Sequence, residues 1–159
     1  MTQPPDSHTD EETRRGHEFF APRAFNHTWE LLDADHLGRE QEEEMLSSAF
    51  AQRYHWYQVG TPRNRAIADW QISRVACVLG YPDLARRFGE RGLEIAVEHG
   101  LDPFVTGFAH EAIARAAATV DDVETFTEHF ELAKSALAAI EEDEDREVLA
   151  ADLAEMSEP

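Results

Sequence analysis

The sequence is poor in cysteine and in basic residues, and each shortage excludes a class of protein. Cys77 is the single cysteine among 159 residues, so no disulfide can form within the chain. Lys and Arg together number 14 against 33 Asp and Glu, which gives a formal net charge of −19. Such an excess of negative charge opposes binding to the phosphates of nucleic acids or to anionic lipid. We therefore expect no nucleic acid and no membrane among the partners.

Long hydrophobic runs are also missing. No apolar stretch approaches the ~18 residues that a membrane-spanning helix needs, and the chain opens without an apolar signal segment, so we expect a cytoplasmic protein. The hydrophobic content of 42% is sufficient for a packed core. Residues 1–16, rich in Pro, Ser, Asp and Glu, are predicted to form a disordered tail, and residues 17–159 a single domain.

The remaining sequence has the periodicity of helices. Apolar residues recur at spacings of three and four, and no stretch alternates with period two. Glycine or aspartate followed by proline marks several boundaries, as at Gly80–Pro82 and Gly100–Pro103, and Asp121 is placed to cap the helix that follows it. The predicted helices are 22–33, 40–59, 62–79, 82–99, 103–119, 122–141 and 145–156. Short loops between them predict an all-α fold of stacked antiparallel αα-hairpins, about three in number, with an acidic C-terminal capping helix.

Two of these hairpins share a spacing of large and small residues. In the first, Ile72 and Ser73 form a large–small pair, Gly80 lies at the turn, and Ala85 and Gly92 are small positions of the second helix. In the second, Ile113 and Ala114 form the large–small pair, Asp121 lies at the turn, and Phe130 and Ala133 are the aromatic and small positions of the second helix, whose early small position is occupied by Phe126. Over residues 62–140 the chain thereby resembles the tetratricopeptide-repeat (TPR) family, whose unit has about 34 residues. The segments His55–Pro62, Trp70–Val75 and Phe108–Arg115 also resemble uncharacterised bacterial TPR-like proteins.

The resemblance implies a concave face lined by the first helix of each hairpin, where such arrays bind peptides or other partners. That face carries Trp70, Gln71 and Arg74 on one helix and Glu111 and Arg115 on another. Arg74 and Arg115 share a repeat position, so their guanidinium groups are expected to converge on one anionic group. The same charges also fit an internal network, because Glu111 precedes Arg115 by one turn and is within reach of Arg74. The sequence leaves both interpretations open.

Signals of catalysis are weak. The eight histidines lack the spacing of a zinc or di-iron motif, there is no glycine-rich phosphate loop, and Cys77 lies among apolar residues. We expect no metal, no cofactor and no catalytic residue. Our first hypothesis is a non-catalytic adaptor that captures a protein, a peptide or an anionic group on the concave face. The alternatives are a small-molecule pocket or minor enzyme that uses His55, His110 and Glu111, and a homodimer.

Overall fold

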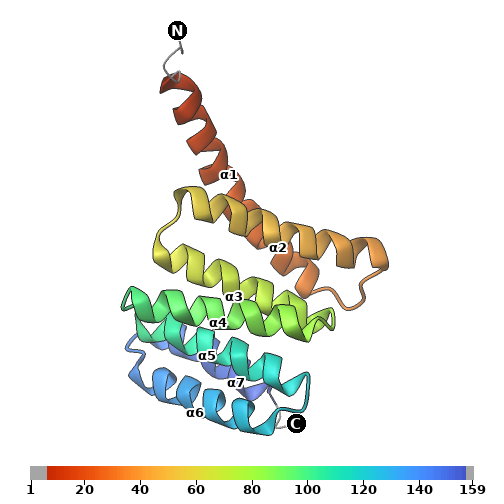
Figure 1. Ribbon diagram of the computed structural model, residues 1–159, viewed down its shortest axis with the longest axis vertical. Coiled ribbons are helices and arrows are strands. Elements are labelled where there is room, and N and C mark those ends of the chain that lie inside the picture. Colours follow the sequence, from red (N-terminus) through yellow and green to blue (C-terminus); the bar gives the residue numbers. More distant parts are fainter. Residues whose placement is uncertain (1–6, 157–159) are drawn as a thin grey trace. The chain divides into compact units, whose positions relative to one another are not determined.

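The computed structural model describes residues 7–156, which form seven α-helices and no strand (Figure 1). The predicted all-α class of antiparallel hairpins is confirmed. Each helix lies within a few residues of its predicted range, except that the first begins much earlier. The helices are α1 (Ser7–Leu32), α2 (Arg39–Val59), α3 (Pro62–Val78), α4 (Pro82–Glu98), α5 (Pro103–Ala118), α6 (Val123–Ala139) and α7 (Asp143–Ala154).

Two glycine turns end helices where the sequence predicts. Gly80 and Gly100 adopt φ values of 74° and 57°, a left-handed conformation that glycine adopts without a side-chain clash. After each glycine the next amide donates back to the helix, Tyr81 N to Ala76 O at 2.8 Å and Leu101 N to Ala96 O at 2.9 Å. These bonds satisfy carbonyl groups that the helix end leaves without partners.

The turn before α6 differs from its prediction. Asp121 does not cap α6, because its own backbone takes the left-handed conformation with φ 56° and ends α5 as the glycines end the earlier helices. Asp122 is the cap, and its carboxylate accepts a hydrogen bond from Thr125 N at 3.1 Å. The assignment of the cap to Asp121 was therefore wrong by one residue.

The chain divides into two compact units, Met1–Thr61 and Pro62–Pro159, here called the N-terminal and C-terminal units. The sequence analysis expected one domain over 17–159. The N-terminal unit is the hairpin of α1 and α2, in which the small or flexible side chains of Ala21, Met45 and Ala49 are fully buried. Three large aromatic side chains of this hairpin are about half exposed: Phe19, Phe20 and Tyr54.

Part of the predicted disordered tail is helical. Residues 7–16 belong to α1, and residues 1–6 of that predicted tail lie outside the described residues. Two ion pairs at helical spacing, Arg14 with Glu18 and Arg15 with Glu11, lie along the exposed start of α1. Such pairs support a helix although composition favours disorder.

The C-terminal unit contains the hairpins α3–α4 and α5–α6, followed by α7. Gly92 of α4 lies so close to α3 that an added Cβ would be 3.3 Å from Ala66 O, as expected for a small repeat position. Gly107 of α5 makes room for Leu149 of α7, which is fully buried. The last helix therefore packs on the second hairpin through its leucines. No helix of the described residues is both long and apolar enough to cross a bilayer.

Candidate binding site

Four of the predicted site residues meet inside the C-terminal unit. Trp70 and Arg74 lie one turn apart on α3, and Glu111 and Arg115 lie one turn apart on α5, so each pair occupies a single helix face. The structure brings the two faces together around the Glu111 carboxylate, which is fully buried. Gln71, the next predicted residue, is also fully buried in α3.

Donors from both helices surround the Glu111 carboxylate. Trp70 Nε1 donates to Oε2 at 2.8 Å, and Arg115 Nε donates to Oε1 at 2.5 Å. Arg74 Nη1 lies 3.5 Å from Oε1, a distance at which it contributes charge more than a hydrogen bond. A buried carboxylate is tolerated only when it is paired and hydrogen-bonded in this way.

The last helix supplies further carboxylates to the same arginine. Asp152 Oδ1 of α7 lies 3.4 Å from Arg74 Nη1, and Glu155 Oε2, at the end of α7, lies 3.6 Å from Nη2. Arg115 Nη2 also donates to the main-chain oxygen of Asp152 at 3.4 Å. We call the group of Trp70, Arg74, Glu111, Arg115 and Asp152 the Glu111 network, and it joins α3, α5 and α7.

Hydrogen bonding in this network is incomplete at Arg74 Nη1. Its side chain is 15% exposed, and Nη1 is buried without a hydrogen bond among the described residues, although two carboxylates lie nearby. Burial raises the pKa of Asp152, although Arg74 acts in the opposite direction. The Asp152 carboxylate is therefore a poorly solvated and imperfectly bonded neighbour for the arginine. The guanidinium keeps the capacity to bond a better-placed acceptor.

Aromatic rings lie beside the network. Trp70 packs edge to face on Phe108 with ring centroids 5.1 Å apart, and Phe108 contacts Phe104 in the same manner at 4.8 Å. These contacts orient the indole ring whose Nε1 reaches Glu111. Trp70 is only 8% exposed, so it serves as a buried donor and offers little surface to a ligand.

The two predicted histidines belong to other clusters. His55 is in the N-terminal unit, where its Nδ1 lies 2.8 Å from Nδ1 of His17 and its ring contacts Phe20 and Tyr54. His110 is on α5, where its Nδ1 lies 3.0 Å from Nδ1 of His129 on α6. Each of these histidines therefore has an imidazole partner, and neither is among the described contacts of Glu111.

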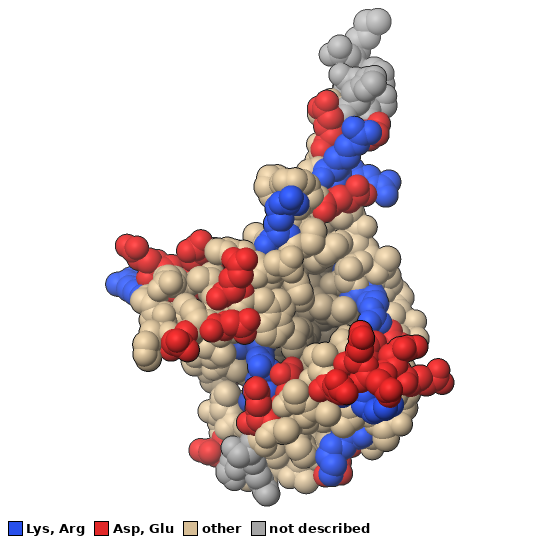
Figure 2. Space-filling view, turned by 180° about the vertical axis from the view of Figure 1, so that it is seen from behind, with Lys and Arg blue, Asp and Glu red and all other residues tan. Residues whose placement is uncertain are grey.

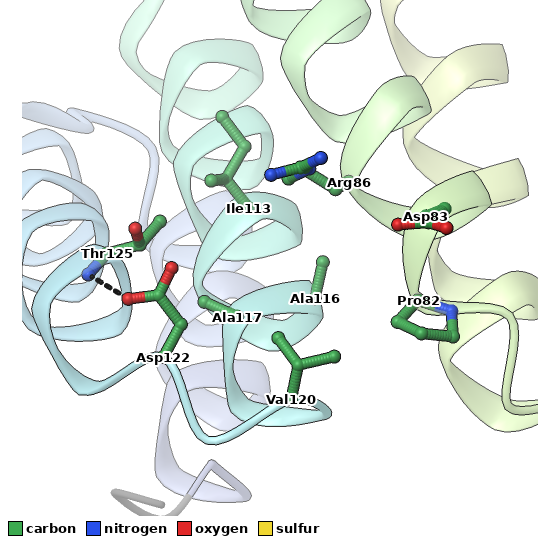
Figure 3. A pocket seen from close by; sticks show the side chains of 9 residues that line it. All are labelled: Pro82, Asp83, Arg86, Ile113, Ala116, Ala117, Val120, Asp122 and Thr125. Atoms are coloured by element: carbon green, nitrogen blue, oxygen red, sulfur yellow. Dashed lines mark hydrogen bonds between the residues drawn. The ribbon is translucent and has the colours of Figure 1, made fainter.

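A small cavity lies between α4, α5 and the start of α6 (Figure 3). Its volume is about 100 Å³, and Arg86 and Asp122 are among its polar lining residues. The Asp122 carboxylate is already engaged by Thr125 N, as the dashed line shows. Hydrogen bonding with the Thr125 side chain and main chain, together with the charge of nearby Arg86, lowers the pKa of Asp122. The predicted site residues do not line this cavity, and apolar side chains such as Ile113 and Val120 form much of its wall.

Cys77 and the side chains that could ligate a metal are the groups to consider for nucleophilic or metal chemistry. Burial raises the pKa of the Cys77 thiol to about 12, so the reactive thiolate is scarce at neutral pH. Among the described residues, no group of three or more His, Cys, Asp and Glu side chains is placed to hold a metal ion. What the Glu111 network can do is hold carboxylates by charge and hydrogen bonding.

Several residues of these clusters were missed by the sequence analysis. Asp152 is one of many acids in the C-terminal stretch, and its spacing from Leu149 and Leu153 is the signal that places it on the packed side of α7. Asp69 is fully buried on α3 and lies 3.3 Å from Arg91 Nε of α4, but nothing in the sequence separates it from a surface acid. His17 and His129 are distant in sequence from their partners.

Comparisons with family models, with curated proteins and with solved structures each gave no match.

The face shown in Figure 2 carries acidic and basic side chains interspersed, with the acidic ones in excess. The partly exposed Arg74 and Arg115 are thus two positive groups in a chain of strongly negative charge, and both lie in the Glu111 network.

Proposed function

We propose that this chain is a non-catalytic, TPR-like binding module that captures an acidic helical segment of a partner protein on the face of α3 and α5. The observation that carries the proposal is the environment of Arg74. Its guanidinium is faced by three carboxylates, of which Asp152 and Glu155 come from the C-terminal helix and only Glu111 from the hairpins themselves. The face is therefore suited to carboxylates that arrive on a helix.

The C-terminal helix shows which chemistry the face accepts. Leu149 and Leu153 of α7 are buried, and Asp152 lies between them in sequence and reaches Arg74. A partner helix with the same pattern of two leucines and an acid presents the same groups. Because α7 has only 12 residues, a length at which an isolated helix is marginal, its docking depends on these side chains. An external acidic helix then competes with α7 for the same place.

The TPR-like assignment is supported by the packing of the C-terminal unit. Its consecutive antiparallel hairpins, the close approach at Gly92, and the position of Trp70 and Glu111 on neighbouring first helices all agree with that family's arrangement. The small-molecule hypothesis has less support, because His55, His110 and Glu111 belong to three different clusters. The competing interpretation of the Glu111 network is an internal brace with no external ligand.

Peptide binding to the full chain separates these interpretations. The probe is a fluorescent peptide with the sequence of residues 143–156, and the control peptide carries the changes Asp152→Asn and Glu155→Gln. Fluorescence anisotropy is measured for wild type, Arg74→Gln and Arg74→Glu, with Arg87→Glu as the matched control because Arg87 is exposed on α4. We expect the acidic peptide to bind wild type and Arg87→Glu, and to bind Arg74→Gln at least tenfold more weakly.

The circular dichroism spectrum of each variant is recorded beside the anisotropy. Arg74→Glu is expected to keep its helical spectrum and to lose peptide binding. If Arg74→Glu instead unfolds, Arg74→Gln decides the matter, because it removes the charge without adding a repulsive one. Equal binding of the acidic and neutral peptides, or equal binding by wild type and a folded Arg74→Gln, contradicts the proposal and leaves the brace as the role of the network.

A further inference from the structure

Among the side chains that the structure describes, two pairs of histidines are in contact, and each pair joins the two helices of one hairpin. His17 of α1 and His55 of α2 have Nδ1 atoms 2.8 Å apart. His110 of α5 and His129 of α6 have Nδ1 atoms 3.0 Å apart, with ring centroids separated by 5.1 Å and ring planes inclined by 45°. In both pairs the nitrogen atoms face each other across a helix interface.

The spacing fits a shared metal ion as well as a hydrogen bond. Imidazole nitrogens bind first-row transition metals at about 2.0–2.1 Å, so two nitrogens at adjacent corners of a square-planar or octahedral ion lie about 2.9 Å apart. The Nδ1 atoms of His110 and His129 are 3.0 Å apart, close to this separation. A tetrahedral ion needs about 3.3 Å between the same atoms, which favours metals of tetragonal preference over zinc.

The surroundings of His110 and His129 favour a cation. Burial lowers the pKa of both imidazoles, which favours the neutral form in which an imidazole binds a metal. Glu128 of α6 acts on both rings and Glu90 of α4 acts on His129, in each case in the direction of raising the pKa. These carboxylates supply negative charge near the pair without being part of a three-residue ligand group.

We propose that His110 and His129 form a two-imidazole site for a divalent transition metal ion, Cu²⁺ or Ni²⁺, bound through the two Nδ1 atoms with water in the remaining positions. The proposal departs from our sequence-based expectation of no metal, because a separation of 19 positions between the two histidines matches no metal motif. It is independent of the peptide face, since neither histidine belongs to the Glu111 network. Both side chains are half-buried, so the open positions of the ion face the surface of the α5–α6 hairpin.

The site is tested by titrating the full chain with Cu²⁺ in a competing glycine buffer. The variant His110→Gln/His129→Gln keeps polar side chains at both positions, and His36→Gln/His99→Gln removes two exposed histidines outside the pairs as the matched control. We expect the first variant to bind one ion fewer per chain than wild type, and the control to bind as many as wild type. Electron paramagnetic resonance of the ion assigned to the pair is expected to show coupling to two imidazole nitrogens.

The change in melting temperature tests the site without relying on the number of ions bound per chain. Cu²⁺ is expected to raise the melting temperature of wild type and of the control more than that of His110→Gln/His129→Gln, because an ion that binds only the folded hairpin stabilises it. Equal numbers of bound ions in wild type and the pair variant, together with equal thermal shifts, overturn the proposal and leave the pair as an imidazole–imidazole hydrogen bond. Residual binding at His17 and His55 does not obscure this, since both proteins contain that pair.

Discussion

The two units of the chain keep their helices together in different ways. The C-terminal unit buries large apolar side chains such as Ile72, Phe108 and Leu149 and places a fully buried carboxylate, Glu111, among them. The N-terminal unit buries fewer large apolar side chains, and its buried residues are Ala21, Thr28, Leu31, Met45, Ala49 and Gln52. Three of its aromatic side chains, those of Phe19, Phe20 and Tyr54, remain about half exposed.

This difference separates the charges that stabilise the fold from the charges that contribute little to its stability. In the C-terminal unit, ion pairs at Glu111 are shielded from water, so they fix the positions of α3, α5 and α7 and are costly to break. In the N-terminal unit, the described ion pairs such as Arg14 with Glu18 are exposed and contribute little. Changes to single charges are therefore expected to have large effects in one unit and small effects in the other.

The largest effect is expected for Glu111→Ala. The change leaves the Arg74 and Arg115 guanidinium groups and the Trp70 Nε1 donor without their buried acceptor, which costs about 3–5 kcal/mol of unfolding free energy. Glu111→Gln keeps an acceptor for Trp70 and is expected to cost less. Urea denaturation followed by circular dichroism measures both, with the exposed Glu18→Ala in the N-terminal unit as the control. A loss below about 1 kcal/mol for Glu111→Ala contradicts the structural importance of the network.

A smaller effect is expected for Gly107→Ala. An added Cβ would lie 2.5 Å from Leu149 Cδ2, so the leucine must shift away from α5. Overpacking of this kind costs about 1–3 kcal/mol. Hydrogen exchange measured by mass spectrometry is expected to be faster than in wild type, and this increase is expected to be larger in α7 than in α3 or α4. Gly16→Ala is the control, because nothing lies within 4 Å of the Cβ it would add. Unchanged exchange in α7 is the contradicting result.

Acidification is expected to affect the two units differently. The pKa values of His110 and His129 are lowered from 6.5 by burial, so the unfolded chain binds protons more readily than the folded one. The stability they contribute is present above pH 6.5 and is lost as the pH falls from that value through their folded pKa. In the N-terminal unit two histidines act in opposite directions. Burial lowers the pKa of His55, whereas hydrogen bonds that His27 donates to the Glu44 and Glu30 carboxylates raise the pKa of His27. The contribution of His27 is present below pH 6.5 and is lost as the pH rises through its folded pKa.

Denaturation between pH 7.5 and 5.5 measures this difference. The wild-type C-terminal unit is expected to lose stability with falling pH, and His110→Gln/His129→Gln to lose less. Hydrogen exchange assigns the change to α5 and α6 or to α1 and α2. Burial raises the pKa of the Asp152 carboxyl, so the folded chain binds this proton more readily than the unfolded chain. The contribution of Asp152 to the free energy of unfolding therefore increases as the pH falls from its folded pKa to the ordinary value of 3.8. Identical pH dependence in wild type and the histidine variant contradicts the prediction.

The smallest effect is expected for Asp121→Gly. Asp121 has a φ of 56°, which glycine adopts without the cost that a side chain brings, so the change is expected to stabilise the C-terminal unit by about 0.5–1 kcal/mol. Thermal denaturation measures the gain. The reverse change at an equivalent turn, Gly100→Asp, is expected to destabilise by a similar amount. A loss of stability in Asp121→Gly means that the aspartate has a role beyond its backbone conformation.

Helix positions were predictable because their signals are local. Pro82 and Pro103 begin helices, Gly80 and Gly100 end them, and each signal depends on the backbone of a few neighbouring residues. The exception at Asp121 follows the same principle, since a turn that needs a left-handed residue accepted aspartate where glycine was absent. The start of α1 at Ser7 was not predictable from composition, which favours disorder for its first residues.

The candidate site was predictable only in part. The resemblance to tetratricopeptide repeats implied that Trp70, Arg74, Glu111 and Arg115 lie on one face of neighbouring helices, but it left undecided whether the charges meet each other or a ligand. The spacing of Asp152 from Leu149 and Leu153 places it on the packed side of α7, but its contact with Arg74 depends on how α7 packs against the hairpins. The pairing of His110 with His129 depends on the relative register of α5 and α6. Such contacts are set by tertiary packing and not by neighbouring residues.

The most direct test of the central claim is nuclear magnetic resonance of the full chain during addition of the unlabelled peptide of residues 143–156. If the α3–α5 face binds acidic helices and α7 is its resident occupant, saturating peptide shifts the Trp70 indole N–H and the Arg74 side-chain signals and moves the α7 amides towards those of a free helix. These changes are expected to be absent in Arg74→Gln. A Trp70 signal that stays in place at saturating peptide, with α7 amides unchanged, contradicts the claim.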